Sequence, residues 1–140
     1  TGAGGSLGAV LSNSPIADYI KTLATGNLAG IGAIVLLFVI SALLKTAQGS
    51  STVALVTTSS MMAPMLAQLG ITTPLQLALA VMAIGAGAMT VSHVNDSYFW
   101  VVSQFSGMKV TDAYKAQTMG TLLEGLATII TTIIIFALFA

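Results

Sequence analysis

Cysteine and arginine are absent from this sequence of 140 residues, and charge of either sign is scarce. Without cysteine the chain has neither disulfides nor thiolate metal ligands. Charged residues make up 6% of the chain, against about 25% in a soluble domain, and cannot solvate a globular surface. Hydrophobic residues reach 56%, and the mean hydropathy is +0.98. The composition therefore predicts an integral membrane protein built from α-helices.

Several functional signals are missing as well. The net charge is zero and no basic run is present, which excludes nucleic acid as a partner. A single histidine and scattered acids predict no metal site, and no nucleophile triad or phosphate-binding loop stands above chance. We therefore expect no enzyme activity and no cofactor. No signal peptide is visible before the first apolar stretch, so we expect either a trimmed chain or a piece of a longer protein.

Short polar segments divide the apolar sequence. Ser14-Pro15 is typical of a helix start, because serine caps the first turn and proline lacks an N–H that would need a partner there. All 140 residues are expected to form one transmembrane domain. Its predicted parts are an interfacial helix at 14–25, a re-entrant hairpin at 28–69 with its tip at 46–52, a broken span at 75–105, a connector at 109–118 and a final span at 119–139.

The first polar segment, residues 45–52, allows two interpretations. If 28–44 and 53–69 both cross the membrane, the segment is a loop and Lys45 extends to the lipid headgroups. If they are the arms of a re-entrant hairpin, the segment is its tip, buried near the middle of the membrane. Both stretches are short for a hydrocarbon core of about 30 Å. The small hydroxyl-bearing residues favour the tip, since irregular backbone at that depth has to line a cavity.

The second polar segment, residues 92–97, carries the single histidine of the sequence, His93. Asp96-Ser97 is typical of a helix N-cap, which is a structural role. Hydrogen-bonding side chains at the break of a span are costly without a task, which favours a functional role for His93, Asn95 and Asp96. The two interpretations of Asp96 do not exclude each other.

Each polar segment precedes the N-terminus of a helix. Free N–H groups and the positive end of the helix dipole favour an anion there. Two broken helices that point at one cavity are a recurring construction of transporters. The pattern therefore predicts an anion or a carboxylate as ligand.

Glu124 is the single charge of the predicted final span. With Gly120, Thr128 and Thr131 it recurs at helical spacing, so we expect this stripe to face other helices and the isoleucines to face lipid. Glu124 has two interpretations, a proton relay or a structural carboxyl near the membrane boundary. Its position close to the start of the span favours the structural role.

Both polar segments resemble signatures of the gluconate permease family. Residues 46–54, TAQGSSTVA, resemble its Ala-Gln-Gly-Ser-x-Thr-Val-Ala signature, and residues 92–100, SHVNDSYFW, resemble its His-Val-Asn-Asp-Ser-x-Phe-Trp signature. The opening Gly2-Ala3-Gly4-Gly5 fits the glycine-rich segment of the family. The resemblance runs over essentially the whole chain and corresponds to the C-terminal third of such a permease.

The resemblance implies a multi-pass secondary transporter of the bacterial inner membrane, which imports a sugar acid or small hydroxy-carboxylate with protons. It also implies an inverted-repeat fold with this chain as most of the second repeat, and it favours the hairpin interpretation. The implied partners are the lipid bilayer and either the remainder of the transporter or a second copy. Tyr98 stands where the family commonly has a small residue, a departure expected to reshape the pocket.

We therefore predict a site made from both polar segments. His93 and Asp96 are predicted to exchange protons during transport. Lys109 and Lys115 favour a cytoplasmic connector, with the C-terminus outside. The alternatives are a non-transporting membrane subunit or fragment, a passive channel and a sodium-coupled carboxylate carrier. The predicted substrate-binding residues are Gln48, Gly49, Ser50, Ser51, Thr52, Asn95 and Ser97.

Overall fold

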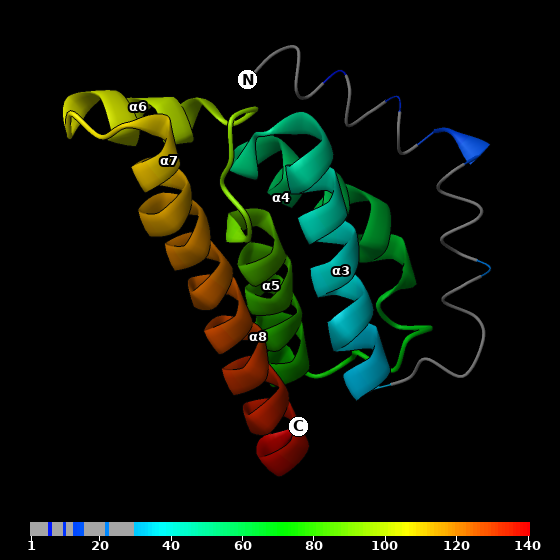
Figure 1. The fold of residues 1–140 in the computed structure, drawn as a ribbon. Helices are drawn as coiled ribbons and strands as arrows, with labels where there is room; N and C mark the ends of the chain where they lie inside the picture. Colours follow the sequence, from blue (N-terminus) through cyan, green and yellow to red (C-terminus); the bar gives the residue numbers. More distant parts are fainter. Residues whose placement is uncertain (1–5, 7–9, 11–12, 16–21, 23–29) are drawn as a thin grey trace.

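The computed structural model describes residues 6, 10, 13–15, 22 and 30–140 of the chain. The predicted interfacial helix at 14–25 lies outside the described residues except at three positions. From residue 30 onward the chain is all-α without strands, which confirms the all-α part of the prediction (Figure 1). The elements are α3 (Ile31–Gln48), α4 (Ser51–Met62), the 3-10 turn η1 (Ala63–Met65), α5 (Pro74–Met89), α6 (Ser97–Phe105), α7 (Val110–Ala113), the π-turn η2 (Tyr114–Thr118) and α8 (Met119–Phe139).

Two of these helices are long and apolar enough to cross a membrane. One is α3, whose 18 residues rise about 27 Å. The other runs without interruption from Val110 to Phe139, because α7, η2 and α8 join into one helix of 30 residues. The segment 109–118, expected as a connector, is thus helical from Val110 onward and belongs to the same rod as the predicted final span.

The reversal between α3 and α4 is tighter than the predicted tip at 46–52. Residues 46–48 continue α3 and residues 51–52 already belong to α4, so two residues make the turn. Gly49 has a φ of 77°, a left-handed backbone that glycine adopts without steric cost, and its N–H donates to the Lys45 carbonyl over 2.8 Å. Ser50 then caps α4 by accepting the N–H of Val53.

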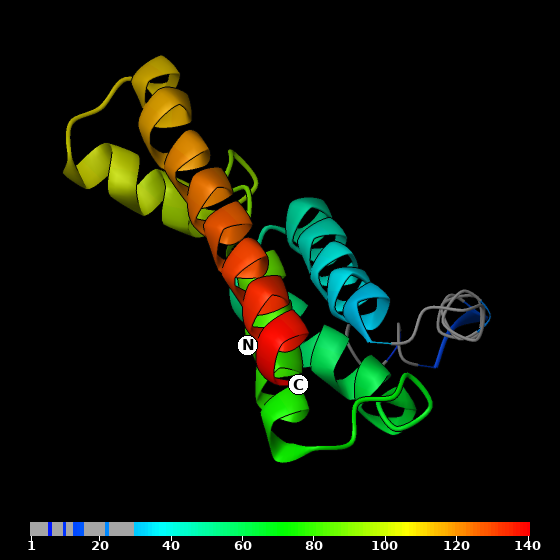
Figure 2. The same cartoon turned by 90° about the horizontal axis from the view of Figure 1, so that it is seen from below.

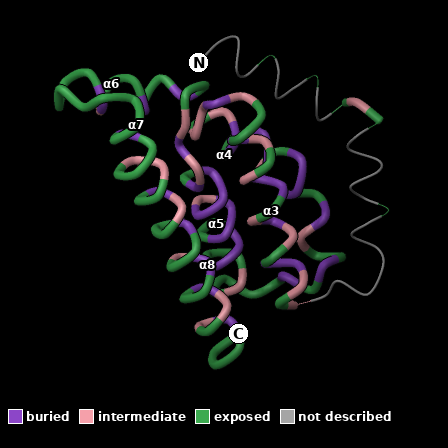
Figure 3. Tube along the Cα trace, viewed as in Figure 1, coloured by how far each residue is buried: buried purple, intermediate pink, exposed green. Residues whose placement is uncertain are grey.

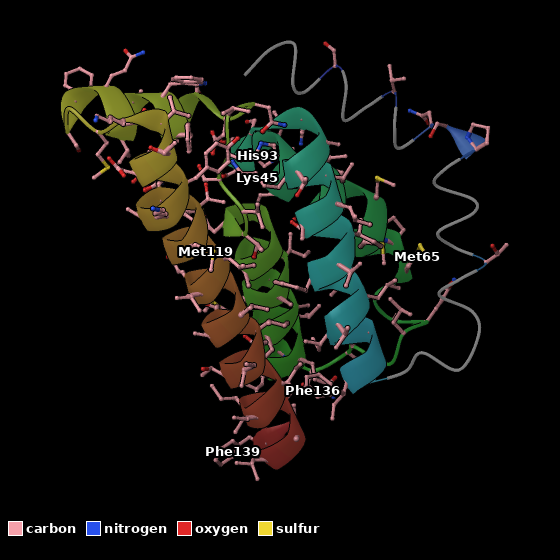
Figure 4. All side chains as sticks on the ribbon, viewed as in Figure 1. Lys45, Met65, His93, Met119, Phe136 and Phe139 are labelled. Atoms are coloured by element: carbon pink, nitrogen blue, oxygen red, sulfur yellow. The ribbon has the colours of Figure 1, made fainter. Side chains whose placement is uncertain are left out.

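The end of the α3–α4 pair opposite the turn is also held together by a main-chain hydrogen bond. The N–H of Gly30, just before α3, donates to the carbonyl of Leu69 over 3.3 Å. Gly30 lies near Phe136 at the far end of α8, and Figure 4 shows Phe136 and Lys45 toward opposite ends of α3. The helix α3 therefore begins near the C-terminal end of α8, and its end with Lys45 lies toward the η2 end of that rod.

The core lies around α5, which packs between α3 and α8. The buried residues of this helix begin at Leu79 and gather in its second half, as the purple segments of Figure 3 show. Two glycines permit the close approach on its two sides. A Cβ on Gly87 of α5 would collide with the Phe38 carbonyl of α3, and a Cβ on Gly125 of α8 would collide with the hydroxyl of Thr90. Ala33, Ile34 and Leu37 of α3, all fully buried, fill the apolar contact.

The face of α8 that packs on α5 is not the stripe of Glu124. Thr121, Gly125, Ile129, Thr132 and Phe136 are buried, whereas Gly120, Glu124 and Thr131 are exposed. The expectation that the Glu124 stripe faces other helices stays a prediction. The two stripes differ by one residue and both contain glycine and threonine, so helical spacing alone does not separate them. Gly125 determines the face that packs on α5, because any side chain at this position would collide with Thr90.

The two arms of the predicted broken span do not continue along one axis. After α5 ends at Met89, the chain turns, and α6 lies across the end of the α7–α8 rod (Figures 1 and 2). Phe99, fully buried, packs against the rings of Trp100 and Tyr114 and fixes α6 there. The turn includes Val91 at a φ of 56°, which is a strained conformation for a β-branched residue.

Candidate functional site

The fold brings the two polar segments into direct contact. The side-chain amide of Asn95 donates to the Thr46 carbonyl over 2.7 Å. Gly49 lies so close to the main chain of Asn95 that a Cβ would collide with its carbonyl group. The turn between α3 and α4 and the break between α5 and α6 therefore form one polar region. Only glycine at position 49 leaves room for this contact.

A buried ion pair lies in this region. The ammonium of Lys45 is 2.5 Å from Oδ2 of Asp96, and the two side chains are 1% and 6% exposed. Lys45 also donates to the carbonyl of Gly49 over 3.3 Å. A lone buried charge would be strongly destabilising, and these contacts compensate it. The pair ties the end of α3 to the start of α6.

Asp96 is held by more than the lysine. The hydroxyl of Ser92 donates to Oδ2 over 2.7 Å, and the N–H of Tyr98 donates to Oδ1 over 3.0 Å. The last bond is the N-cap of α6. The carboxylate therefore caps a helix and closes an ion pair at the same time, so the structural interpretation of Asp96 is confirmed and a functional one stays compatible with it.

The N-termini of α4 and α6 both open at this region. Ser50 and Asp96 cap the two helices, and the first helical residues are Ser51 and Ser97. Ser51 is half-buried, whereas Thr52 and Ser97 are exposed. The first N–H groups of a helix lack partners within it, so each of these ends offers donors to an anion.

Gln48, the last residue of α3, has a free donor in this region. Its Nε2 atom is buried and has no hydrogen-bond partner. Among the described residues, two further buried side-chain atoms share this property, the hydroxyls of Thr57 and Thr58 in α4. A buried amide donor without a partner costs about 1–3 kcal/mol, so an oxygen acceptor supplied by a ligand would be favoured beside Gln48.

His93 lies in the same region, but its imidazole is not hydrogen-bonded to the side chains of the ion pair. Its Nδ1 accepts the N–H of Asn95 over 3.4 Å, and its ring is partly exposed. Figure 4 shows His93 and Lys45 at the same end of the helices. The main-chain N–H of Asp96 donates to the His93 carbonyl over 2.8 Å, whereas the Asp96 carboxylate accepts its hydroxyl bond from Ser92.

The sequence analysis placed Lys45 and Ser92 in the two polar segments but did not name them among the site residues. A signal for Lys45 was present, since it and Asp96 are the only Lys, Arg, Asp or Glu residues between positions 28 and 108 and have opposite charges. Two lone opposite charges in apolar surroundings are expected to pair, because each is costly alone. For Ser92 there was no comparable signal, because its contacts depend on the tertiary fold.

The chain matches the family model described as GntP family permease over residues 1–139. The gluconate permease of Bacillus licheniformis is 36% identical over 118 residues, which are 84% of this chain and 25% of that protein. The inner membrane permease YgbN of Escherichia coli is 34% identical over 125 residues, 89% of this chain and 26% of that protein. No solved structure matches the chain.

A relative with a different substrate in its name is the D-serine transporter DsdX of Escherichia coli, 31% identical over 134 residues, which are 96% of this chain and 29% of that protein. The chain thus spans little more than a quarter of the curated relatives that it matches. Permeases are membrane transport proteins and not enzymes, which agrees with the sequence analysis. The family resemblance of the two polar segments is confirmed, and the chain belongs to the GntP family of permeases.

Proposed function

We propose that this chain is part of a secondary active transporter that imports a sugar acid or a similar small hydroxy-carboxylate with protons. The observation that carries the proposal is the buried Lys45–Asp96 pair beside two helix N-termini and the free amide of Gln48. Family membership supports transport, and the names of the relatives support a carboxylate. One relative is named for D-serine, so amino acids belong among the candidate substrates.

The donors around the pair suit a hydroxy-carboxylate. The N–H groups at the starts of α4 and α6 and the amide of Gln48 would receive the carboxylate. The hydroxyl groups of the substrate would form hydrogen bonds with the side chains of Ser51, Thr52, Asn95 and Ser97. Gly49 and Ser50 shape the turn that presents these donors.

Proton coupling follows from the chemistry of the ion pair. Asp96 compensates the charge of Lys45. A proton on Asp96 would leave the ammonium without its partner, and the substrate carboxylate would then take that place. Proton and substrate would therefore favour each other's binding, which is the thermodynamic requirement for symport. His93, partly exposed beside Asn95, is the proposed route of the proton to Asp96.

We place the transporter in the bacterial inner membrane, where one relative is named an inner membrane permease. In this proposal residues 28–69 are a re-entrant hairpin and the chain is most of the second of two inverted repeats. The remainder of the transporter, or a second copy, completes the substrate site. The connector at 109–118 is cytoplasmic in this arrangement.

The test is uptake by proteoliposomes that contain the full-length natural protein. We expect an inward proton gradient to drive accumulation of gluconate or a smaller hydroxy acid. Asp96→Asn and His93→Ala should abolish or strongly reduce the pH-driven accumulation, whereas Asp112→Asn, on the exposed surface, should not. If Asp96→Asn and His93→Ala both keep the pH-driven accumulation, the proton-coupling assignment is wrong.

The same preparation separates the alternatives. Accumulation driven by a sodium gradient and not by a pH gradient would favour the sodium-coupled carrier. Flux that equilibrates the substrate without any gradient would favour a channel. A non-transporting subunit predicts no thermal stabilisation of the intact protein by any carboxylate in a screen that includes gluconate, lactate and D-serine.

A further inference from the structure

The helix α8 and the π-turn before it hold the main chain at the break between α5 and α6. The hydroxyl of Thr118 donates to the Ser92 carbonyl over 2.7 Å, and the N–H of Ser92 donates to the hydroxyl of Thr121 over 3.0 Å. Thr121 in turn donates its hydroxyl proton to the Thr118 carbonyl, which leaves its oxygen lone pairs for Ser92. Both polar groups of Ser92's main chain thus depend on two threonines of the α7–α8 rod.

These two bonds replace the helical hydrogen bonds that the main chain of Ser92 lacks because α5 has ended. The helical bonds of α5 end with the N–H of Thr90, and Val91 follows in its strained left-handed conformation. Ser92 is 2% exposed, so water does not satisfy its peptide groups. A strained backbone persists only where surrounding contacts determine it, and the two threonines supply such contacts.

The side chain of Ser92 connects the fixed main chain at the break to the candidate site. Its hydroxyl donates to Oδ2 of Asp96, the same oxygen that faces the Lys45 ammonium. Lys45 in turn contacts the carbonyl of Gly49 at the turn between α3 and α4. A continuous chain of hydrogen bonds therefore connects the α7–α8 rod, the break and the turn that carries the predicted substrate donors.

The π-turn η2 sets which face of α8 reaches the break. In a regular α-helix, eight steps of about 100° would place Ala113 and Thr121 about 80° apart. A π-turn takes up one residue more than an α-turn, so it brings the two positions close to one face. Ala113 is fully buried and Thr121 is 7% exposed. The rod can therefore pack its α7 part on α6 and its α8 part on the break.

We propose that Thr118 and Thr121 are positioning residues for the carboxylate site. They do not touch the substrate. They fix the main chain of Ser92, and through the Ser92 hydroxyl they fix the orientation of the Asp96 carboxylate against Lys45. This inference rests on the proposed function only in what the positioned carboxylate does, whereas the positioning itself is a property of the fold.

The test uses the full-length natural protein with Thr118→Val, Thr121→Val and the double substitution. Valine keeps the shape of threonine and removes the hydroxyl. Thr118→Ser and Thr121→Ser retain the hydroxyl and should keep wild-type behaviour. Thr131→Val is the matched control, because Thr131 is exposed on the same helix and bonds only to the Ala127 carbonyl of its own turn.

The first readout does not depend on transport. Val94, exposed between Ser92 and Asp96, is replaced by cysteine in a cysteine-free background, and its modification rate by a water-soluble maleimide is measured. We expect each valine variant to raise the rate about twofold, because position 94 is already 43% exposed and gains only the freedom that the lost hydrogen bond releases. The serine variants and Thr131→Val should leave it unchanged.

The second readout is the kinetics of uptake. We expect the valine variants to raise KM for the carboxylate, with rescue by serine, because the site is populated less often in its binding geometry. A labelling rate that valine does not change overturns the positioning role, whatever the transport result. Changed labelling without measurable uptake of any carboxylate supports the positioning and counts against the proposed function. Changed labelling with unchanged KM overturns the link to the site.

Discussion

At the scale of single residues, pairing lowers the free-energy cost of burying the charges of Lys45 and Asp96 in apolar surroundings. Each charge is therefore stable there only while its partner is present. Substitution of one partner leaves the second buried and unpaired. We expect Lys45→Met or Asp96→Asn to lower the free energy of unfolding by about 3–5 kcal/mol, and the double substitution to lower it by clearly less than the sum. The measurement is a double-mutant cycle of thermal or denaturant unfolding on the purified full-length protein.

Lys115→Met serves as the control for this cycle, since Lys115 is exposed. Additive effects of the two substitutions would contradict the pair, because independent side chains have no interaction energy to lose.

Gly49 has no room for a side chain and a backbone conformation that disfavours one. Its positive φ disfavours any side chain by about 1–2 kcal/mol, and a Cβ would collide with the Asn95 carbonyl. We therefore expect Gly49→Ala to destabilise the protein by more than this amount and to separate the two polar segments. Gly120→Ala is the counterpart, since a Cβ there meets no atom within 4 Å and alanine favours a helix by about 1 kcal/mol. Melting temperatures of the two variants should move in opposite directions.

At the scale of elements, the π-turn η2 predicts that removing one residue from it and adding one residue to it have opposite effects on folding. Deletion of the exposed Ala116 would convert η2 into regular α-helix and keep Ala113 and Thr121 on one face. Insertion of one alanine after Ala116 would turn the two parts about 100° out of register. We expect the deletion to retain folding and the contacts of Ser92, and the insertion to lose them.

Yield of monodisperse protein and the labelling rate of the cysteine at position 94 measure both outcomes. An insertion tolerated as well as the deletion would show that η2 does not set the helix face.

Most of the elements could be predicted from the sequence, whereas their contacts could not. Apolar stretches and the two polar segments predicted an all-α membrane chain, and the residues of the two motifs, in their order along the chain, indicated the family. Helical spacing did not decide which face of α8 packs inward, because the stripes of Glu124 and Gly125 are alike in composition. The bonds of Ser92 to Thr118 and Thr121 join positions far apart in the chain, and no local pattern records them.

At the scale of the whole molecule, the depth of the turn between α3 and α4 separates the two interpretations of residues 28–69. A re-entrant tip predicts that a cysteine at Ser51 reacts with reagents that enter from one side of the membrane only and is protected by bound substrate. Two complete spans predict free reaction at headgroup level, without protection. Labelling of single-cysteine variants in oriented vesicles, with Lys109→Cys as the marker of the connector side, measures the difference.

The ion pair also has an electrical consequence. The ion pair itself holds one positive and one negative charge, and the site loaded with one proton and one monovalent carboxylate again carries no net charge. A charge that moves across the membrane potential exchanges about 2.3 kcal/mol per 100 mV, and a site that is neutral in both states exchanges none. Uptake with one proton per substrate should therefore be electroneutral. A potassium diffusion potential imposed at constant pH should leave the initial rate of uptake unchanged, and a rate that follows the potential would require a second proton.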